Sequence, residues 1–427
     1  MVSCSHEDDA MSVLNYRKRL IESQIKKKMA YSGGIIIEGA KWVGKSTTAG
    51  MFSSTVIKLQ DPLIKKKYQI LATISKDEVL KGEKPILFDE WQEVPEIWDF
   101  IRLDIDDNNH KGAYLLTGST KKQTIQTSHT GTGRINSIYM RPMSLYESGE
   151  SNGLVSLQEL FSKPQVIPVM SDITIDDIAH CICRGGWPGS LDLSKNMQLE
   201  VPKDLLESII GRDMDEVDGI IKDKEKVRKI IKSYARNIST LAAHSTIYKD
   251  QSYDVVVNPK TFDTYMNSLK RLYIVEDVLP WSQNIRSSAR LRKGSKRQFV
   301  DPSIAVAALG LSPDRLKQDF ETFGFLFESI ATRDLRVYAE EIEGTVYYYT
   351  DTTGLEVDLI VELNDGRWGG IEVKLGENEV DKASANLLKL ATISTRKPAF
   401  LMIVTNTRMA YQRFDGVYVI PLGCLKP

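Results

Sequence analysis

Long hydrophobic runs are missing from this sequence. No apolar stretch approaches the roughly 20 residues that cross a lipid bilayer, and residues 1–9 have neither the basic nor the apolar region of a signal peptide. The sequence therefore predicts neither a membrane-spanning segment nor a signal peptide. We expect a cytoplasmic protein with no membrane partner.

Cysteine is also scarce. The chain has 4 cysteines, Cys4, Cys181, Cys183 and Cys424, which are too few and too scattered for a disulfide framework. Cys181 and Cys183 form a C-x-C pair that lacks a second pair of zinc ligands, although His180 stands beside it. We expect buried, reduced thiols.

An excess of positive charge is absent as well. The 427 residues include 56 Lys and Arg against 57 Asp and Glu, a net charge of -1. This balance argues against a protein that coats nucleic acid through its overall charge, but it leaves a local basic patch open. The 42% hydrophobic and 26% charged residues are typical of a soluble protein. The length allows two to four domains of about 100–200 residues each.

A phosphate-binding motif follows a short apolar run. Residues 35–37 are three isoleucines that predict a buried strand, and the next residues fit the pattern G-x-x-x-x-G-K-[ST]. The motif consists of Gly39, Ala40, Lys41, Trp42, Val43, Gly44, Lys45, Ser46 and Thr47. Its glycines let backbone N–H groups surround a phosphate, Lys45 adds a charge, and the Ser46 hydroxyl can ligate Mg²⁺. We predict that ATP and Mg²⁺ bind here, the alternative being a glycine-rich turn without function.

A second apolar strand ends in two acids. Residues 86–88 precede Asp89 and Glu90, about forty residues after the phosphate-binding motif. In the Walker B arrangement the first acid orients Mg²⁺ and the second polarises the attacking water. We therefore predict that Asp89 is a metal ligand and that Glu90 is the catalytic base.

Polar residues after the next strands extend this prediction. A strand over residues 113–117 ends at Thr117 and leads to Ser119, and either hydroxyl can hold the hydrolytic water or simply cap a turn. Arg134 follows a glycine-flanked loop, from which its planar guanidinium can reach a γ-phosphate in its own or a neighbouring subunit. Arg141 is the second candidate for this role, and a surface ion pair is the alternative for both arginines.

The middle of the chain is predicted to be mostly helical. Apolar residues at helical spacing occupy 227–238 and 258–272, and residues 273–275 read as a strand, which is compatible with a winged helix. Residues 286–297 then hold six basic side chains, which can contact nucleic-acid phosphates or form a flexible basic loop. These are Arg286, Arg290, Arg292, Lys293, Lys296 and Arg297.

The C-terminal part combines a carboxylate-bearing helix with short strands. The helix carries Glu328, and two later strands carry Asp358 and the pair Glu372 and Lys374. Since side chains alternate along a strand, Glu372 and Lys374 point to one face. This D…E-x-K pattern is typical of restriction-endonuclease-like nucleases, in which the acids bind Mg²⁺ and the lysine stabilises or deprotonates a nucleophile. We predict Asp358, Glu372 and Lys374 as catalytic residues and Glu328, Asp358 and Glu372 as metal ligands, or else a salt-bridged platform that only binds.

Taken in order, the motifs resemble those of prokaryotic AAA-type ATP-binding proteins that carry a C-terminal domain of unknown function. The resemblance runs from about residue 12 almost to the end. It rests on the segments GAKWVGKST, ILFDEWQ, YLLTGS, HTGTGRI, MRPMSLYESGES, RGGWP, YIVED and FVDPS. The resemblance implies a nucleotide-driven module, a helical or winged-helix middle and a restriction-endonuclease-like end, and it implies no substrate. Many members have Arg-Gln where this chain has Lys41 and Trp42.

We therefore expect an α/β protein in three parts. These are a P-loop AAA-type ATPase core over residues 1–165, a helical lid and winged-helix region over 166–300, and an α/β restriction-endonuclease-like domain over 301–427. The expected function is ATP hydrolysis that drives a conformational change. An ATP-regulated nuclease and an ATP-gated scaffold with an inactive nuclease-like docking domain are the alternatives. Nucleic acid, a protein and a second copy of the chain stay open as partners.

Overall fold

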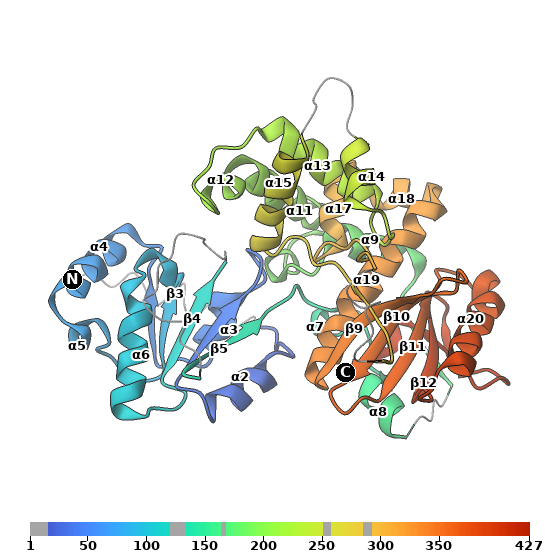
Figure 1. Cartoon of the computed structure of the whole chain (residues 1–427), viewed down its shortest axis with the longest axis horizontal. Coiled ribbons are helices and arrows are strands. Elements are labelled where there is room, and N and C mark those ends of the chain that lie inside the picture. The colour runs from blue at the N-terminus through green and yellow to red at the C-terminus, as the bar shows by residue number, and fades with distance from the viewer. Residues whose placement is uncertain (1–15, 120–132, 164–167, 251–257, 285–292) are drawn as a thin grey trace. The chain divides into compact units, whose positions relative to one another are not determined.

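The computed structural model describes residues 16–119, 133–163, 168–250, 258–284 and 293–427 (Figure 1). The chain divides into two compact units. The first unit contains residues 1–141, 217–219 and 271–273, and the second contains residues 142–216, 220–270 and 274–427.

The first unit is built on a parallel five-stranded sheet in the order β2-β3-β4-β1-β5 (Figure 1). Its strands are β1 (Gly34–Glu38), β2 (Thr55–Lys58), β3 (Ile86–Asp89), β4 (Tyr114–Gly118) and β5 (Ile135–Tyr139). The inner strands β3 and β4 are buried along their whole length, because a parallel sheet is covered on both faces. Strands β1, β3 and β4 lie where the apolar runs of the sequence predict them.

Helices of the first unit pack against this sheet. They are α2 (Glu22–Met29), α3 (Lys45–Gly50), α4 (Pro62–Ile74), α5 (Lys76–Val79) and α6 (Glu96–Asn108). At the start of α4 the Asp61 carboxylate accepts hydrogen bonds from the backbone N–H groups of Leu63 and Ile64, which the helix itself leaves without partners. Tyr68 of α4, Ile101 of α6 and the strand residues share one hydrophobic core.

The middle of the chain is helical, as its sequence predicts. The helices are α7 (Leu145–Ser148), α8 (Leu157–Ser162), α9 (Ile175–Arg184), α10 (Lys195–Gln198), α11 (Val201–Ser208), α12 (Met214–Glu216), α13 (Lys224–Arg236), α14 (His244–Lys249), α15 (Pro259–Arg271), α17 (Pro302–Leu309) and α18 (Pro313–Gln318). The strand expected at 273–275 is reduced to single bridges, Val275 with Phe299 and Val278 with Lys296. The winged helix stays a prediction.

The second unit contains an eight-stranded mixed sheet in the order β7-β13-β14-β12-β11-β10-β9-β8. The strands are β7 (Val169–Met170), β8 (Leu279–Pro280), β9 (Gly344–Thr350), β10 (Glu356–Leu363), β11 (Trp368–Val373), β12 (Phe400–Thr405), β13 (Met409–Gln412) and β14 (Tyr418–Pro421). Strands β9, β10 and β11 are antiparallel neighbours, and β12 runs parallel to β11. The central strand β11 is buried throughout.

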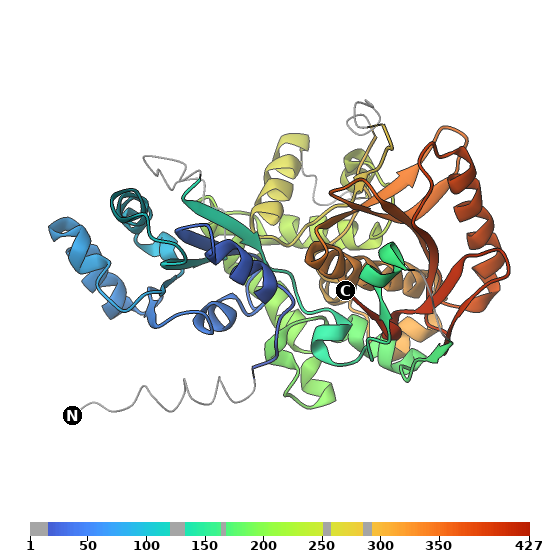
Figure 2. The same cartoon turned by 90° about the horizontal axis from the view of Figure 1, so that it is seen from below.

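Two long helices cover opposite faces of this sheet (Figures 1 and 2). They are α19 (Phe320–Glu341) and α20 (Val380–Ile393). Leu387 of α20 packs with Trp368 and Ile403 in one apolar cluster. Helix α19 is largely buried and brings the polar side chain of Glu328 to the other face.

The segment that follows β5 is bound to the C-terminal part of the chain. Strand β6 (Val155–Ser156) pairs with β15 (Leu425–Lys426), and the Ser151 hydroxyl donates a hydrogen bond to the carbonyl oxygen of Leu425 at 2.6 Å. The first compact unit accordingly stops at residue 141, earlier than the expected boundary near residue 165, because residues 142–162 find their partners in the second unit. The division into three domains stays a prediction. Within the described ranges, no helix has both the length and the apolar character needed to cross a membrane.

Candidate functional site

The phosphate-binding loop joins the carboxyl end of β1 to the first residue of α3. Gly39 and Gly44 have φ angles of 153° and 94°. A Cβ atom on Gly39 would lie 2.2 Å from the carbonyl oxygen of Met140, so only glycine fits against this neighbouring chain segment. The glycine positions of the motif are thus required by both backbone conformation and space.

Lys45 points back into its own loop. Its Nζ donates hydrogen bonds to the carbonyl oxygens of Gly39 at 3.0 Å and Ala40 at 2.8 Å. Burial lowers the pKa of Lys45 to about 8, although the carboxylates of Glu90 and Asp89 oppose this shift. An incoming phosphate offers stronger acceptors for this ammonium than the two carbonyl groups do.

Ser46 and Asp89 meet where the two Walker motifs come together. The Ser46 hydroxyl donates a hydrogen bond to Asp89 Oδ1 at 2.5 Å, and Thr117 Oγ1 donates to the same oxygen at 2.5 Å. Strands β3 and β4 are parallel neighbours, so their carboxyl ends, which carry Asp89 and Thr117, lie at one edge of the sheet. Hydroxyl and carboxylate oxygens are the ligands that Mg²⁺ prefers, so this donor set fits the ion.

Glu90 lies beside this cluster and is held by three partners. Its Oε2 accepts hydrogen bonds from Ser119 Oγ at 3.1 Å, from the Ser119 backbone N–H at 3.3 Å and from Gln92 Nε2. Its backbone N–H donates to Thr117 Oγ1 at 3.0 Å. Thr117 and Ser119 therefore both contact the Walker B acids. Gln92 was not predicted, although it stands only two residues after Glu90 in the sequence.

Arg19 is a further residue at this loop that no sequence pattern identifies. Its guanidinium is buried and donates hydrogen bonds to the carbonyl oxygens of Val43 at 2.7 Å and Arg141 at 2.8 Å. It thereby links the phosphate-binding loop to the segment that follows β5. A single basic residue in a basic stretch carries no pattern that would distinguish it beforehand.

A second cluster of charged residues lies in the second unit. Strands β10 and β11 are antiparallel with Leu359 opposite Ile371, which places Asp358 next to Glu372. Lys374 Nζ lies 2.9 Å from Asp358 Oδ2 and 2.7 Å from Glu372 Oε2. The structure thus brings together the three residues of the D…E-x-K pattern.

Lys296 enters the same cluster from a distant segment. Its Nζ lies 2.8 Å from Glu328 Oε1, 3.4 Å from Asp358 Oδ1 and 3.5 Å from Glu356 Oε1, and its side chain is 1% exposed. The basic stretch predicts either a phosphate contact or a flexible basic loop at Lys296, and the burial of this side chain is incompatible with both. Arg297 is also buried and pairs with Asp277 at 2.8 Å.

Burial and the two lysines together set the ionisation of this cluster. Burial alone raises the pKa of Asp358, but the ammonium groups of Lys296 and Lys374 outweigh it and hold that pKa well below its usual range. Burial raises the pKa of Glu328 to about 7, and burial together with the neighbouring Asp358 carboxylate raises the pKa of Glu372. The neighbouring carboxylates raise the pKa of Lys374 despite its burial, so this lysine stays protonated and is a poor base.

These contacts leave little room for the Mg²⁺ that the pattern predicts. Asp358 Oδ1 contacts Lys296, and Oδ2 contacts Lys374 and the backbone N–H of Val373. Glu372 uses one oxygen for Lys374 and the other for Asn386 at 3.4 Å. In the described part of the chain no three His, Cys, Asp or Glu side chains are arranged to hold a metal ion. The donor set therefore does not fit a divalent ion at this cluster.

Comparison with known families bears on the segments that hold these two sites. Residues 32–149 match the family model described as an AAA domain. This segment, which holds both Walker motifs, is similar to an AAA domain, and we call residues 32–149 the AAA domain. Residues 175–315 and 323–425 match two models that are each described as a domain of unknown function, DUF8612 and DUF4143. Lys296 belongs to the former match, whereas Asp358, Glu372 and Lys374 belong to the latter.

Solved structures add only distant similarities to the chain. A Walker-type ATPase of Pyrococcus abyssi is 14% identical, covers 71% of this chain and 95% of its own, and has a TM-score of 0.39. A complex of Thermococcus gammatolerans McrB AAA+ hexamers with bound McrC is 12% identical, covers 47% and 72%, and has a TM-score of 0.19. No curated protein matches the chain. The AAA assignment rests on the family model.

The structure does not bring Arg134 to the nucleotide site of its own AAA domain. Arg134 precedes β5, and Ile135 pairs with Gly34 at the amino end of β1, whereas the phosphate-binding loop follows the carboxyl end. Its side chain is 43% exposed and forms an ion pair with Asp106 at 2.5 Å. Arg141, which follows β5, lies at the same edge as the loop, with its guanidinium 4.7 Å from the centre of the Tyr139 ring.

The prediction of buried, reduced thiols can be compared with three of the four cysteines. Cys181, Cys183 and Cys424 are free and buried, as expected, while Cys4 lies outside the described residues. His180 Nε2 is hydrogen-bonded to Gln198 Oε1 at 2.8 Å.

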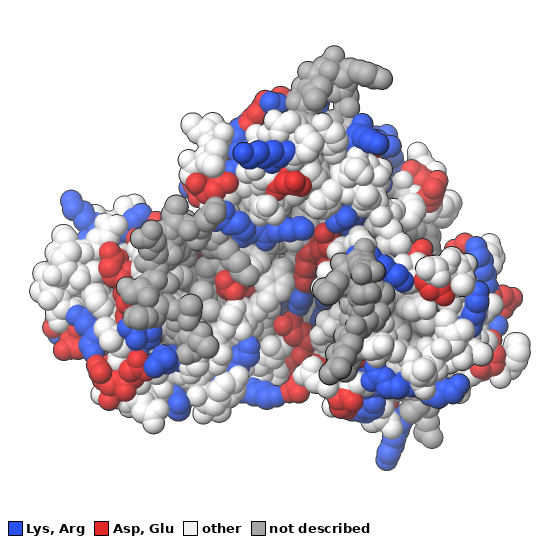
Figure 3. All heavy atoms as spheres, viewed as in Figure 1, with Lys and Arg blue, Asp and Glu red and all other residues white. Residues whose placement is uncertain are grey.

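Of the basic segment, Arg286, Arg290 and Arg292 lie outside the described residues, and Lys293 donates a hydrogen bond to the carbonyl oxygen of Thr350. Acidic and basic side chains are interspersed over the face drawn in Figure 3. The described residues on this face therefore do not favour a nucleic-acid partner.

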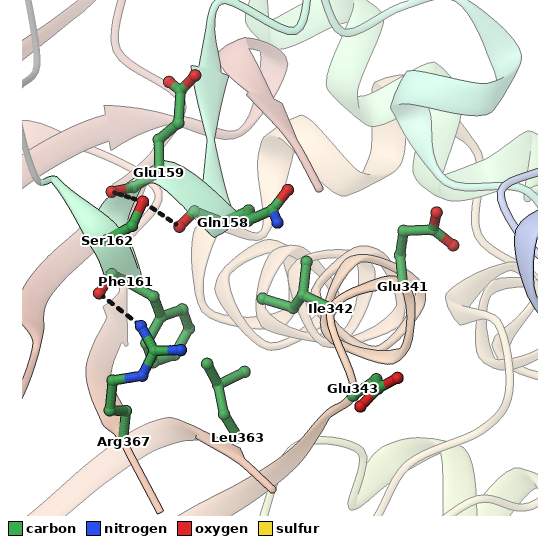
Figure 4. Close-up of a pocket in the computed structure, with 9 residues that line it drawn as sticks. All are labelled: Gln158, Glu159, Phe161, Ser162, Glu341, Ile342, Glu343, Leu363 and Arg367. Atoms are coloured by element: carbon green, nitrogen blue, oxygen red, sulfur yellow. Dashed lines mark hydrogen bonds between the residues drawn. The ribbon is translucent and has the colours of Figure 1, made fainter. Parts of the chain in front are cut away.

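A pocket of about 390 Å³ opens in the second unit between α8, the end of α19 and the turn after β10 (Figure 4). Phe161, Ile342 and Leu363 form its apolar lining. Arg367 crosses one side, where its Nη1 donates a hydrogen bond to the carbonyl oxygen of Phe161 at 3.1 Å. The described residues that line this pocket include none of those predicted for either site.

Proposed function

We propose that the AAA domain binds ATP, hydrolyses it and uses the cycle to change the conformation of the chain. The observation that carries this proposal is the convergence of Lys45, Ser46, Asp89 and Glu90 at one edge of the parallel sheet. Lys45 and the loop N–H groups hold the phosphates. Glu90 accepts a proton from the attacking water, and its hydrogen bonds to Ser119 fix the carboxylate for this step.

Mg²⁺ fits the same arrangement. Ser46 and Asp89 would hold the ion, which supplies positive charge beside the phosphates when it is bound. Thr117 orients Asp89 through the hydrogen bond between their side chains. The protein therefore contributes oxygen ligands that are already close together before nucleotide arrives.

A conformational response to ATP follows from the contacts of the loop. To reach a phosphate, the Lys45 ammonium has to leave the carbonyl groups of Gly39 and Ala40. The loop is also held through Val43 by Arg19, which binds the carbonyl of Arg141. A rearranged loop is thus connected to the residues that lead out of the AAA domain.

Phosphate release from the purified full chain tests this proposal. We expect release with ATP and Mg²⁺ and its loss when EDTA removes the ion. Limited proteolysis with ATP, with ADP and without nucleotide should give different fragment patterns if the cycle changes the conformation. Absence of phosphate release under all conditions contradicts the hydrolysis proposal, and identical fragment patterns contradict the conformational one.

For the C-terminal part we propose a restriction-endonuclease-like fold that serves as a docking platform. The order α19, β9, β10, β11, α20, β12 supports this fold, because three antiparallel strands are followed by a helix and a parallel strand. The ion pairs of Lys296 and Lys374 with the acids favour docking over cleavage. A protein partner and a second copy of the chain stay open.

Incubation with plasmid and single-stranded DNA separates the two possibilities. The full chain is tested with Mg²⁺ or Mn²⁺, with and without ATP. We expect the DNA to stay intact. Cleavage that is lost in Asp358→Asn protein would establish the nuclease alternative instead.

A further inference from the structure

The buried acids Glu328, Asp358 and Glu372 form a cluster on one face of the second unit's sheet, and we call it the acid cluster. We infer that the Lys296 ammonium takes the place of a divalent cation in the acid cluster, so that this part of the protein holds its fold without a metal ion. This assignment goes beyond the proposed ATPase activity and does not depend on it.

The position of the Lys296 ammonium carries the inference. Its Nζ contacts carboxylates from two elements, Glu328 on α19 and Asp358 on β10, as well as the half-exposed Glu356. A buried ammonium has three donors and is strongly unfavourable without acceptors. Here carboxylate oxygens surround it, as oxygen ligands surround a bound cation.

Lys374 completes the neutralisation from the other side. It bridges Asp358 and Glu372 at 2.9 and 2.7 Å, so Asp358 lies between two ammonium groups. Two adjacent carboxylates repel each other unless positive charge lies between them. The charge that a metal ion would contribute is already present in the side chains.

The backbone around Lys296 is fixed, which distinguishes this residue from a mobile surface lysine. Lys296 and Val278 exchange two backbone hydrogen bonds of 2.9 Å. The buried Gln298, two residues later, accepts a hydrogen bond from Ser329 Oγ of α19 at 2.7 Å. The segment therefore holds the ammonium in the acid cluster.

Mn²⁺ serves as the probe for the test, because its bound and free forms differ in paramagnetic resonance spectra. The full chain is used without nucleotide and with Asp89→Asn, which weakens the other site at which the ion can bind. We expect this protein to bind no Mn²⁺ at the acid cluster and to melt at the same temperature with and without the ion. Stoichiometric Mn²⁺ binding that is lost when Asp358→Asn is added would overturn the inference.

Removing the Lys296 ammonium tests the inference in the opposite direction, because Mn²⁺ should then bind. In the same background Lys296→Met should lower the melting temperature, and Mn²⁺ should restore part of the loss because the vacated acids gain a cation. Adding Asp358→Asn should abolish this rescue, and Lys296→Arg, which keeps the charge, should not respond to Mn²⁺. A folded Lys296→Met protein without any Mn²⁺ response contradicts the inference. If Lys296→Met protein does not fold, Mn²⁺ binding and melting of the Asp89→Asn protein still test the inference.

Discussion

Ser46 Oγ lies 2.5 Å from Asp89 Oδ1, although 43 positions separate the two residues along the chain. The contact joins the first residues of α3 to the end of β3 and brings the hydroxyl and the carboxylate to one point. Both phosphate binding and water activation are expected within a few residues of this contact.

Replacing Lys45 with alanine should weaken ATP binding by about 1.5–3 kcal/mol, or roughly 10- to 150-fold, because a charged hydrogen bond to phosphate is lost. Lys45 is buried in the loop, and its Nζ already contacts two loop carbonyl groups. Titration with a fluorescent ATP analogue measures the effect. Lys67→Ala, which removes an exposed lysine of α4, is the control and should bind like the parent. A Lys45→Ala protein that binds the ATP analogue with the affinity of the parent and of Lys67→Ala would contradict the role of Lys45.

Glu90→Gln should keep ATP binding and slow hydrolysis by about 10²–10⁴-fold, since an amide cannot accept the proton of the attacking water. Steady-state phosphate release at saturating ATP gives the rate. The matched control is Glu93→Gln, because Glu93 is paired with Lys65 at 2.6 Å and does not belong to the Walker B pair. A Glu90→Gln protein that turns over at the parental rate would require another base.

Arg134 can act on a nucleotide only in a neighbouring subunit, because it lies at the opposite edge of its own sheet from the phosphate-binding loop. We expect Arg134→Ala to bind ATP with parental affinity and to lose hydrolysis. Mixing it with Lys45→Ala protein should then restore part of the ATPase activity, because one mixed interface has both an intact loop and an intact arginine.

Two outcomes would contradict the proposed role of Arg134. Unchanged hydrolysis in Arg134→Ala alone would reduce the residue to its ion pair with Asp106. Loss of hydrolysis without rescue, in a mixture shown by sedimentation to associate, would argue against action across subunits. Arg141→Ala is the comparison, since Arg141 lies at the edge of the sheet that carries the loop.

Arg333 should be essential for the stability of the second unit. It is fully buried between Asp301 at 2.9 Å and Asp334 at 2.7 Å. Arg333→Met leaves two buried carboxylates without their partner and should reduce the free energy of unfolding by about 3–5 kcal/mol. Urea denaturation of the full chain measures this loss.

The control for Arg333 is the exposed pair of Arg367 and Asp365. These residues are about half exposed, and Arg367→Met should cost far less stability than Arg333→Met because water screens the pair. Similar losses in the two variants would show that the buried network contributes no more than a surface ion pair.

The sequence by itself determined the elements that depend on neighbouring residues. Apolar runs predict β1, β3 and β4, and the glycines and Lys45 of the first motif identify the loop, because strand burial and phosphate binding are both local properties of the chain. Alternation along β11 likewise predicts that Glu372 and Lys374 share a face, and the structure confirms their contact at 2.7 Å.

Tertiary structure alone decided which charges from distant segments meet. Lys296 contacts acids 32 and 62 positions away, and nothing in the basic stretch around it marks it as the buried member. The position of Arg134 could not be predicted either. The glycine-flanked loop before it suggests that the side chain can extend toward a phosphate, but it does not say at which edge of the sheet the arginine lies. Strand direction and strand order determine how far Arg134 lies from the phosphate-binding loop and which acids Lys296 contacts. Such long-range pairs leave no periodic pattern in the sequence, because each partner is placed by a different element of the fold.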